Sequence, residues 1–183
     1  NYSGSRIEVI SMSTGKKIKT FWLVNGAFPA GIAISPDGSE LAVAQYGASS
    51  IIFLNPDNGR TIATIRTSVT VGTPNASLPF DLIYGRPGRL YMVGNPGAGG
   101  FDYIHVINTD TRSEVGISQQ FVRMLPALAI SSDKNILYVN ESSQLPNQLS
   151  KFNVTTDNIG YAFRDTNNNW KYIATYFMLP SDE

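Results

Sequence analysis

The side chains that could do chemistry in this 183-residue chain are few, and their types exclude several kinds of site. The chain has no cysteine and one histidine, so it offers no thiolate nucleophile and no cysteine-ligated metal. His105 lies in the apolar run Tyr-Ile-His-Val-Ile. Because a catalytic histidine needs a positioned partner, we expect a packed strand residue there. No Gly-x-Ser-x-Gly sequence is present, which argues against a serine hydrolase of the nucleophile-elbow type.

Five polar side chains fall in or beside loops between predicted strands, and these are the candidate ligand-binding residues: Asp81, Asn95, Asp102, Arg123 and Glu141. Without a second histidine, a metal site would consist of carboxylate and carbonyl oxygens, the ligands that Ca²⁺ prefers. Asp81, Asp102 and Glu141 are the carboxylates that such a site would use. Isolated, solvated carboxylates are the commoner arrangement. We therefore expect no cofactor, and the sequence does not support a Ca²⁺ site.

Charge and hydropathy argue against two classes of partner. The 14 basic and 14 acidic side chains give a net charge of zero, so we expect no nucleic-acid-binding surface. No apolar stretch approaches the roughly 18 residues that cross a bilayer, so we expect no transmembrane segment. Acceptor sequences for N-glycosylation occur at Asn1, Asn75, Asn140 and Asn153. These favour an extracellular, cell-surface or periplasmic protein.

A repeat of about 44 to 53 residues organises the elements that must position these side chains. Pro29, Pro79 and Pro126 each open a short apolar strand, and a leucine follows 12, 11 and 11 residues later. The repeat units cover residues 6–50, 51–103, 104–148 and 149–183, with approximate boundaries. This period lies within the range of β-propeller blades and outside that of leucine-rich or ankyrin repeats.

Turn residues divide each unit into four short strands. One hairpin turn contains Pro36-Asp37-Gly38, Arg86-Pro87-Gly88 or Asp133-Lys134-Asn135, and the other is marked by Gly15, Gly59 or Arg112. Proline presets φ and glycine accepts φ > 0, so these sequences favour tight turns. We label the strands of a blade a to d, outward from the axis. The chain is then expected to begin with a c–d pair and to continue through three full blades, which makes 14 strands. Strand a is expected to be buried on both faces.

These residues carry a family resemblance. The sequence P-x-G-I-A-I-S-P-D-G-S-x-L-A-V-A, followed by I-I-F-L-N-P-D-N-G-R-T-I-A-T-I, resembles the YVTN-type β-propeller repeat. The match is closest over residues 29–66 and extends with falling specificity over nearly the whole chain. It implies an all-β fold in which residues 1–183 form a partial β-propeller of about three and a half four-stranded blades. The complete ring would be larger, for example seven-bladed.

The resemblance, together with the small number of catalytic groups, favours a non-enzymatic protein used for binding, adhesion or assembly. Its partners would be the remainder of its own propeller or neighbouring protein chains. The alternative is a segment of a lactonase-type propeller hydrolase, in which Asp81, Arg123 and Glu141 would lie at the channel. A cofactor-bearing dehydrogenase propeller is a weaker third option. We expect the binding face to carry the b–c and d–a loops, and the a–b and c–d turns to be structural.

Overall fold

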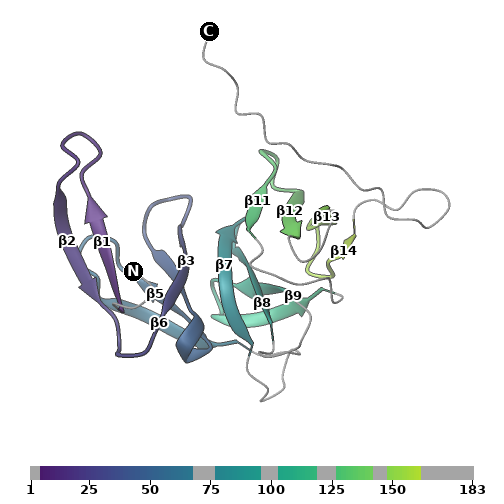
Figure 1. Ribbon diagram of the computed structural model, residues 1–183. Coiled ribbons are helices and arrows are strands. Elements are labelled where there is room, and N and C mark those ends of the chain that lie inside the picture. Colours follow the sequence, from purple (N-terminus) through teal and green to yellow (C-terminus); the bar gives the residue numbers. More distant parts are fainter. Residues whose placement is uncertain (1–4, 68–76, 96–102, 119–126, 142–147, 162–183) are drawn as a thin grey trace, which may run out of the picture.

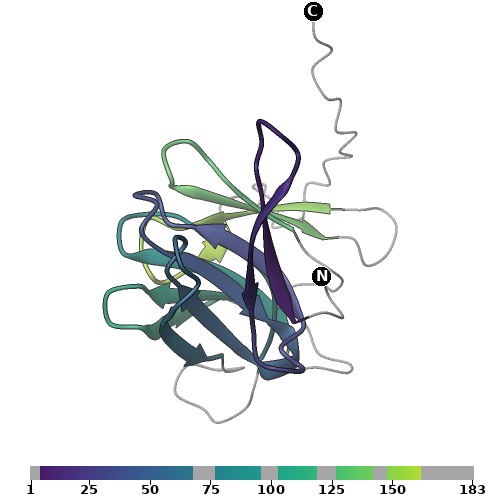
Figure 2. The same ribbon diagram turned by 90° about the vertical axis from the view of Figure 1, so that its left-hand side faces the viewer.

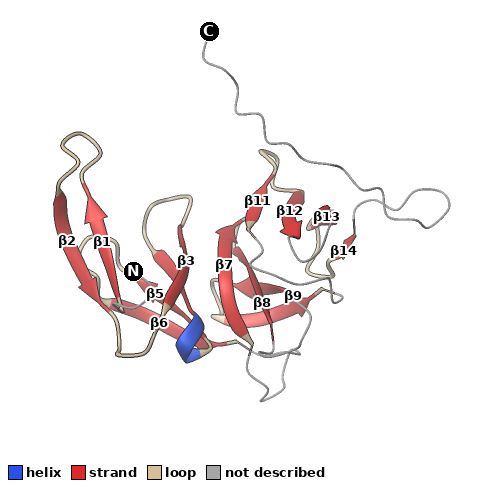
Figure 3. Cartoon of the chain, in the orientation of Figure 1, coloured by secondary structure: helices blue, strands red, loops and turns tan. Residues whose placement is uncertain are grey.

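The structure is a computed structural model that describes residues 5–67, 77–95, 103–118, 127–141 and 148–161, almost all of them in strands and short turns (Figure 3). Its strands are β1 (Arg6–Ile10), β2 (Lys17–Trp22), β3 (Pro29–Ile34), β4 (Leu41–Gln45), β5 (Ser50–Leu54), β6 (Thr61–Arg66), β7 (Leu78–Tyr84), β8 (Arg89–Asn95), β9 (Tyr103–Asn108), β10 (Ser113–Ile117), β11 (Leu128–Ile130), β12 (Ile136–Glu141), β13 (Gln148–Asn153) and β14 (Gly160–Tyr161). A short 3₁₀ helix, Tyr46–Ala48, follows β4. No helix among these residues is long and apolar enough to cross a membrane.

The strands form one hairpin and three antiparallel sheets in chain order. β1 and β2 make a two-stranded N-terminal hairpin, and β3–β6, β7–β10 and β11–β14 make the first, second and third sheets of four strands each. Figure 1 shows the sheets side by side, and Figure 2 views them from the side of the N-terminal hairpin. The predicted pair of strands followed by three units of four is confirmed.

Apolar layers between successive sheets form the core. One layer joins Ala42, Ile51 and Phe53 of the first sheet to residues of the second sheet that include Leu90. The other face of the second sheet, with Tyr91, packs on the third sheet. A smaller cluster places the first sheet against the N-terminal hairpin. Each four-stranded sheet thus contributes to a layer with its neighbour in the chain.

The burial of strand a differs from one sheet to another. In β3, Ile32 and Ile34 are 50% and 56% exposed, whereas all five residues of β5 are buried. In β7, the strand a with a four-stranded sheet on each side, no residue is exposed: Leu82 and Tyr84 belong to the layer with the first sheet, and Ile83 packs on the layer with the third. The expected burial of strand a on both faces is therefore found in the second sheet and not in β3.

The turns repeat as the sequence indicates. The a–b turns place Gly38, Gly88 and Lys134 at φ 74°, 70° and 61°. The c–d turns place Gly15, Gly59 and Arg112 at φ 65°, 72° and 55°. Glycine adopts this left-handed region freely, whereas other residues pay roughly 1–2 kcal/mol there. Lys134 and Arg112 therefore occupy positions that the repeat otherwise gives to glycine.

Candidate functional site

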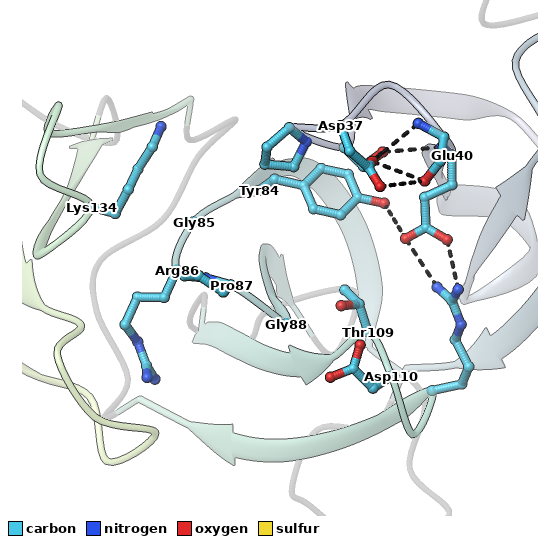
Figure 4. A pocket seen from close by; sticks show the side chains of 14 residues that line it. Asp37, Glu40, Tyr84, Gly85, Arg86, Pro87, Gly88, Thr109, Asp110 and Lys134 are labelled. Atoms are coloured by element: carbon cyan, nitrogen blue, oxygen red, sulfur yellow. Dashed lines mark hydrogen bonds and ion pairs between the residues drawn. The ribbon is translucent and has the colours of Figure 1, made fainter.

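A cavity of about 580 Å³ opens on the face that carries the a–b and c–d turns (Figure 4). The a–b turns of the first and second sheets line it, together with the c–d turn of the second sheet and Lys134 of the third. We expected the binding loops on the opposite face, so this cavity lies where the sequence predicted only structural turns.

The second sheet's a–b turn, which lines the cavity, is one residue shorter than its counterparts. The amides of Ser35 and Ser131 donate to the carbonyls of residues 40 and 136, five positions later, whereas Gly85 donates to the carbonyl of Arg89, four positions later. Gly85 has no space for a side chain, because an added Cβ would lie 2.2 Å from the Tyr91 ring. Residues 85–88 of this shorter turn line the cavity.

One wall is an ion pair between the first and second sheets. Glu40 accepts hydrogen bonds from Arg112 Nη2 at 2.6 Å and Nη1 at 3.1 Å, and from the Tyr84 hydroxyl at 2.8 Å. The Arg112 guanidinium also lies 4.4 Å from the centre of the Phe53 ring, a cation–π distance. Burial and the hydrogen bond to Glu40 raise the pKa of Tyr84 well above its ordinary value, so Tyr84 stays a neutral donor.

An equivalent ion pair joins the second and third sheets. Asp157 accepts hydrogen bonds from Arg86 Nη2 at 2.6 Å and from Arg89 Nε and Nη2, both at 2.7 Å. Hydrogen bonding to Arg89 is the largest cause of the lowered pKa of Asp157. The Tyr91 hydroxyl accepts from Arg86 Nε and donates to the carbonyl of Val154. Of this second ion pair, Arg86 is the residue that lines the cavity.

The first sheet's a–b turn is closed by its own side chains. Asp37 accepts from the hydroxyls of Ser35 and Ser39 at 2.6 and 2.8 Å, and from the amide of Ser39 at 3.1 Å. These donors, chiefly the Ser35 hydroxyl, lower the pKa of Asp37 to about 2. The third sheet repeats this arrangement with Ser131 and Asp133. Both aspartates are therefore ionised at neutral pH and occupied in their own turns.

Two lining side chains of opposite charge have no such partner. The carboxylate of Asp110 and the ammonium of Lys134 make no hydrogen bond or ion pair within the described part of the chain. Asp110 lies on the c–d turn of the second sheet and Lys134 on the a–b turn of the third, so they come from different sheets around the cavity (Figure 4). These two groups are the ones available to an incoming ligand.

Of the predicted ligand-binding residues, Asp81 is the one whose side chain the structure describes. It lies in β7, where its Oδ1 accepts from the amide of Leu82 and its Oδ2 from the amide of Leu128 in the third sheet, both at 2.9 Å. Gly31 of β3 packs on it so closely that an added Cβ would lie 2.7 Å from the Asp81 Cα. Asp81 thus ties the innermost strands of all three sheets together.

The other predicted site residues fall at or beyond the limits of the described residues. Asn95 ends β8 and Glu141 ends β12, and the structure describes neither side chain. Asp102 and Arg123 lie outside the described residues. Whether these residues converge with Asp81 therefore stays a prediction. Among the described residues, no group of three or more acidic or histidine side chains is placed to hold a metal ion.

The glycosylation candidates differ in their surroundings. Asn75 and Asn1 lie outside the described residues. Asn140 is half-buried in β12, paired with Leu149 of β13. Asn153 is exposed at the c–d turn of the third sheet, where its side-chain oxygen accepts from the amide and hydroxyl of Thr155. Asn153 is therefore the most accessible acceptor that the structure describes.

One polar chain was not foreseen from the sequence. His105 is fully buried, as expected, but its Nδ1 lies 2.8 Å from Glu114 Oε1 and its Nε2 lies 3.2 Å from Ser77 Oγ. The order serine–histidine–carboxylate matches that of a hydrolytic triad. Ser77 is also fully buried, so its hydroxyl is closed to a substrate, and the hydrogen bonds instead connect β9 and β10 to the residue that precedes β7. Nothing in the sequence relates residues 77, 105 and 114 to one another, because they come together only when the strands pair.

Comparisons with known proteins establish the fold. No protein-family model and no curated protein sequence matches this chain. Among solved structures, it is similar to the Kuenenia stuttgartiensis hydrazine synthase, with a TM-score of 0.70 and 17% identity, over 87% of this chain and 43% of that one. It is also similar to a chain of the mitotic checkpoint complex, with a TM-score of 0.64 and 17% identity, over 89% and 44% of the two chains. Both proteins contain β-propellers. The chain is a partial β-propeller. It spans less than half the length of these two chains, and at this identity the likeness shows the fold alone.

Proposed function

We propose that this chain is a non-enzymatic binding and assembly module of a secreted or cell-surface protein. In this proposal, the N-terminal hairpin is completed by two further strands from the remainder of the same propeller. The observation that carries the proposal is the hairpin itself, because it has two strands where each of the other sheets has four.

The hairpin has the features of strands c and d. Its turn carries Gly15 at φ 65°, as the c–d turns carry Gly59 and Arg112, and β1 pairs with β2 as β5 pairs with β6. In the three sheets, strand c pairs with strand b along its other edge. The corresponding edge of β1 pairs with no strand among the described residues, so it is available to an added strand.

The hydrogen-bond pattern tells which residues of β1 face that edge. The amide of Leu23 donates to the carbonyl of Ser5, directly opposite. Bonded pairs alternate in an antiparallel ladder, so Ile7 and Val9 also face β2. Arg6 and Glu8 therefore point their amides and carbonyls away from β2 and toward the open edge.

Exposed apolar side chains on the hairpin support the same proposal. Met12, Ile18, Trp22 and Val24 are 98%, 60%, 74% and 65% exposed. Groups of exposed apolar side chains of this kind mark surfaces that another part of a protein covers.

A secreted or cell-surface location adds a second test. Exposed Asn153 and its Thr155 form an acceptor sequence, whereas the equivalent turn residues Asn55 and Asn108 are followed two positions later by aspartates. In a glycosylating host we expect a glycan on Asn153 and none on Asn55 or Asn108, measured by peptide mass spectrometry. Asn153→Gln is the control. An unmodified Asn153 in protein that passed through the secretory pathway would remove this support for the location.

Proline substitutions test the completed hairpin in the intact native protein. Proline removes an amide donor, so Glu8→Pro should break a bond to the added strand and lower the free energy of unfolding by about 1 kcal/mol or more. The matched control is Thr64→Pro in β6, because the amide of Thr64 also faces the outer edge of its sheet and proline is tolerated on an edge strand. Equal stability of the two variants in urea unfolding would contradict the proposal.

A further inference from the structure

Part of the first sheet's apolar face toward the N-terminal hairpin is left uncovered. Ile32 and Ile34 of β3 are 50% and 56% exposed. They pair with Val43 and Leu41 of β4, respectively. Both partners belong to the cluster that packs the first sheet on the hairpin. Because cross-strand partners share a face of the sheet, the same apolar layer continues over β3, where the two isoleucines stay half exposed.

The second sheet shows what the same two positions do beside a complete sheet. Leu82 and Tyr84 of β7 stand at the equivalent positions, opposite strand b. They are 3% and 8% exposed and lie in the layer with the first sheet. Strands a and b of the first sheet, β3 and β4, are the ones that lie chiefly against β7. The hairpin beside β3 has only two strands among the described residues, and these have the features of strands c and d.

The two complete interfaces differ in the size of the side chains that strands a and b present to the next sheet. The first sheet presents alanines from these strands, Ala33, Ala42 and Ala44. The second sheet presents larger side chains, Ile83, Tyr91 and Val93. The residue equivalent to Ile34 is Tyr84 opposite the alanines and Ile130 opposite the larger side chains. Since interiors are close-packed, Ile34 matches the second arrangement.

We propose that strand a of the pair that completes the hairpin packs on Ile32 and Ile34, and that this pair presents branched or aromatic side chains there rather than alanines. The inference rests on the proposed function, because the pair must first join β1, and it adds the side-chain chemistry by which the pair is recognised. Backbone pairing along β1 supplies affinity, whereas side-chain packing supplies specificity. Ile32 and Ile34 therefore select, by size and apolarity, the segment of the protein that completes the hairpin.

Thiol labelling of the intact native protein tests this cover directly. The chain has no cysteine, so Ile32→Cys and Ile62→Cys each introduce one thiol into it, which peptide mapping locates. Ile62 is the matched control, because it is 48% exposed and lies in β6, at the opposite edge of the sheet from β3. Its neighbours Ala63 and Ile65 pack toward the second sheet, so Ile62 faces the hairpin side. With a maleimide, Ile32→Cys should react about tenfold more slowly than Ile62→Cys, since it reacts only after local opening, and equally fast in urea.

A larger side chain tests the size of the residues that the pair presents. Ile34→Tyr introduces the residue that faces alanines at Tyr84. Against branched or aromatic side chains it overpacks, so the equilibrium constant for folding should fall about tenfold or more in urea unfolding of the intact protein. Ile62→Tyr, the matched control, should change that constant less than about threefold.

Two outcomes would overturn the inference. Equal labelling of Ile32→Cys and Ile62→Cys in the native protein would show that no strand packs on β3. Equal stability of Ile34→Tyr and the parent protein would show that the pair presents small side chains there. Either outcome is distinguishable from a failure of the completed hairpin. Loss of stability in Glu8→Pro together with equal labelling would keep the strand beside β1 and remove the strand over β3.

Discussion

The interface between the first and second sheets and the interface between the second and third use the same two positions with opposite charges. The last residue of the a–b turn is Glu40 in one and Arg89 in the other. The fifth residue of the facing c–d turn is Arg112 in one and Asp157 in the other. The closest contacts are 2.6 Å for Glu40–Arg112 and 2.7 Å for Arg89–Asp157. The backbone repeat fixes where the sheets meet, and the side chains decide only the sign of each charge.

The interface between the N-terminal hairpin and the first sheet shows a third solution at the same c–d position. Gly59 stands where Arg112 and Asp157 stand in the later sheets, and the Phe21 ring packs directly against it. Lys19 also donates to the carbonyl of Asp57 at 2.6 Å. Among the described residues, the hairpin has no a–b turn to supply a charged partner, and the contact at this position is with an apolar ring of β2, which makes it sensitive to volume rather than to charge.

The largest expected effect comes from filling the Gly59 position. Gly59→Ala would place a Cβ 2.4 Å from the Phe21 ring at φ 72°, so strain and overpacking should together lower the free energy of unfolding by about 2–4 kcal/mol. Gly15→Ala is the matched control, because it has φ 65° but nothing within 4 Å of the added Cβ. It should cost about 1 kcal/mol. Equal losses in urea unfolding would show that Phe21 does not determine this contact.

An intermediate effect is expected from the two ion pairs. Glu40→Gln and Asp157→Asn should each lower the unfolding free energy by about 1–2 kcal/mol, because the pairs are hydrogen-bonded but partly exposed. The double variant Glu40→Arg with Arg112→Asp gives the first interface the charge order of the second. It should recover more than half of the loss that Glu40→Arg causes alone. A double variant less stable than both single variants would mean that the two interfaces are not interchangeable.

The smallest expected effect is the pH dependence of the stability that the interface between the second and third sheets contributes. The pKa of Asp157 is lowered in the folded chain, so its contribution to stability is present above the unfolded pKa of about 3.9. That contribution is lost as the pH falls below that value and through the folded pKa. Between pH 6 and pH 3, the stability of the parent protein should therefore fall more steeply than that of Asp157→Asn. Parallel curves would show that Asp157 does not supply this acid dependence.

Much of the fold could be predicted because the repeat is local in sequence. The spacing of the prolines and leucines gave the strand order, and the alignment of turn residues placed Gly15, Gly59 and Arg112 at equivalent positions, which the backbone angles confirm. Strand a is buried as expected in β7 but not in β3, since an apolar run does not reveal which faces the neighbouring sheets cover. His105 was correctly expected to be a packed strand residue.

The candidate site was less predictable because its contacts join distant parts of the chain. Arg112 lies 72 positions from Glu40, and Arg89 lies 68 positions from Asp157. The cavity is lined by the shorter a–b turn of the second sheet, which the sequence showed only as the loss of the Ser-Pro-Asp-Gly sequence. Complementary charges at equivalent turn positions were the one signal that could have located the ion pairs.

Amide hydrogen exchange in the intact native protein tests the completed hairpin most directly. The amides of Arg6 and Glu8 face the open edge of β1, and those of Thr64 and Arg66 face the outer edge of β6. If two further strands complete the hairpin, Arg6 and Glu8 should be protected like the bonded amides of β5, while Thr64 and Arg66 exchange rapidly. Rapid exchange at all four amides would contradict the account, because β1 would then be an edge strand in the native protein.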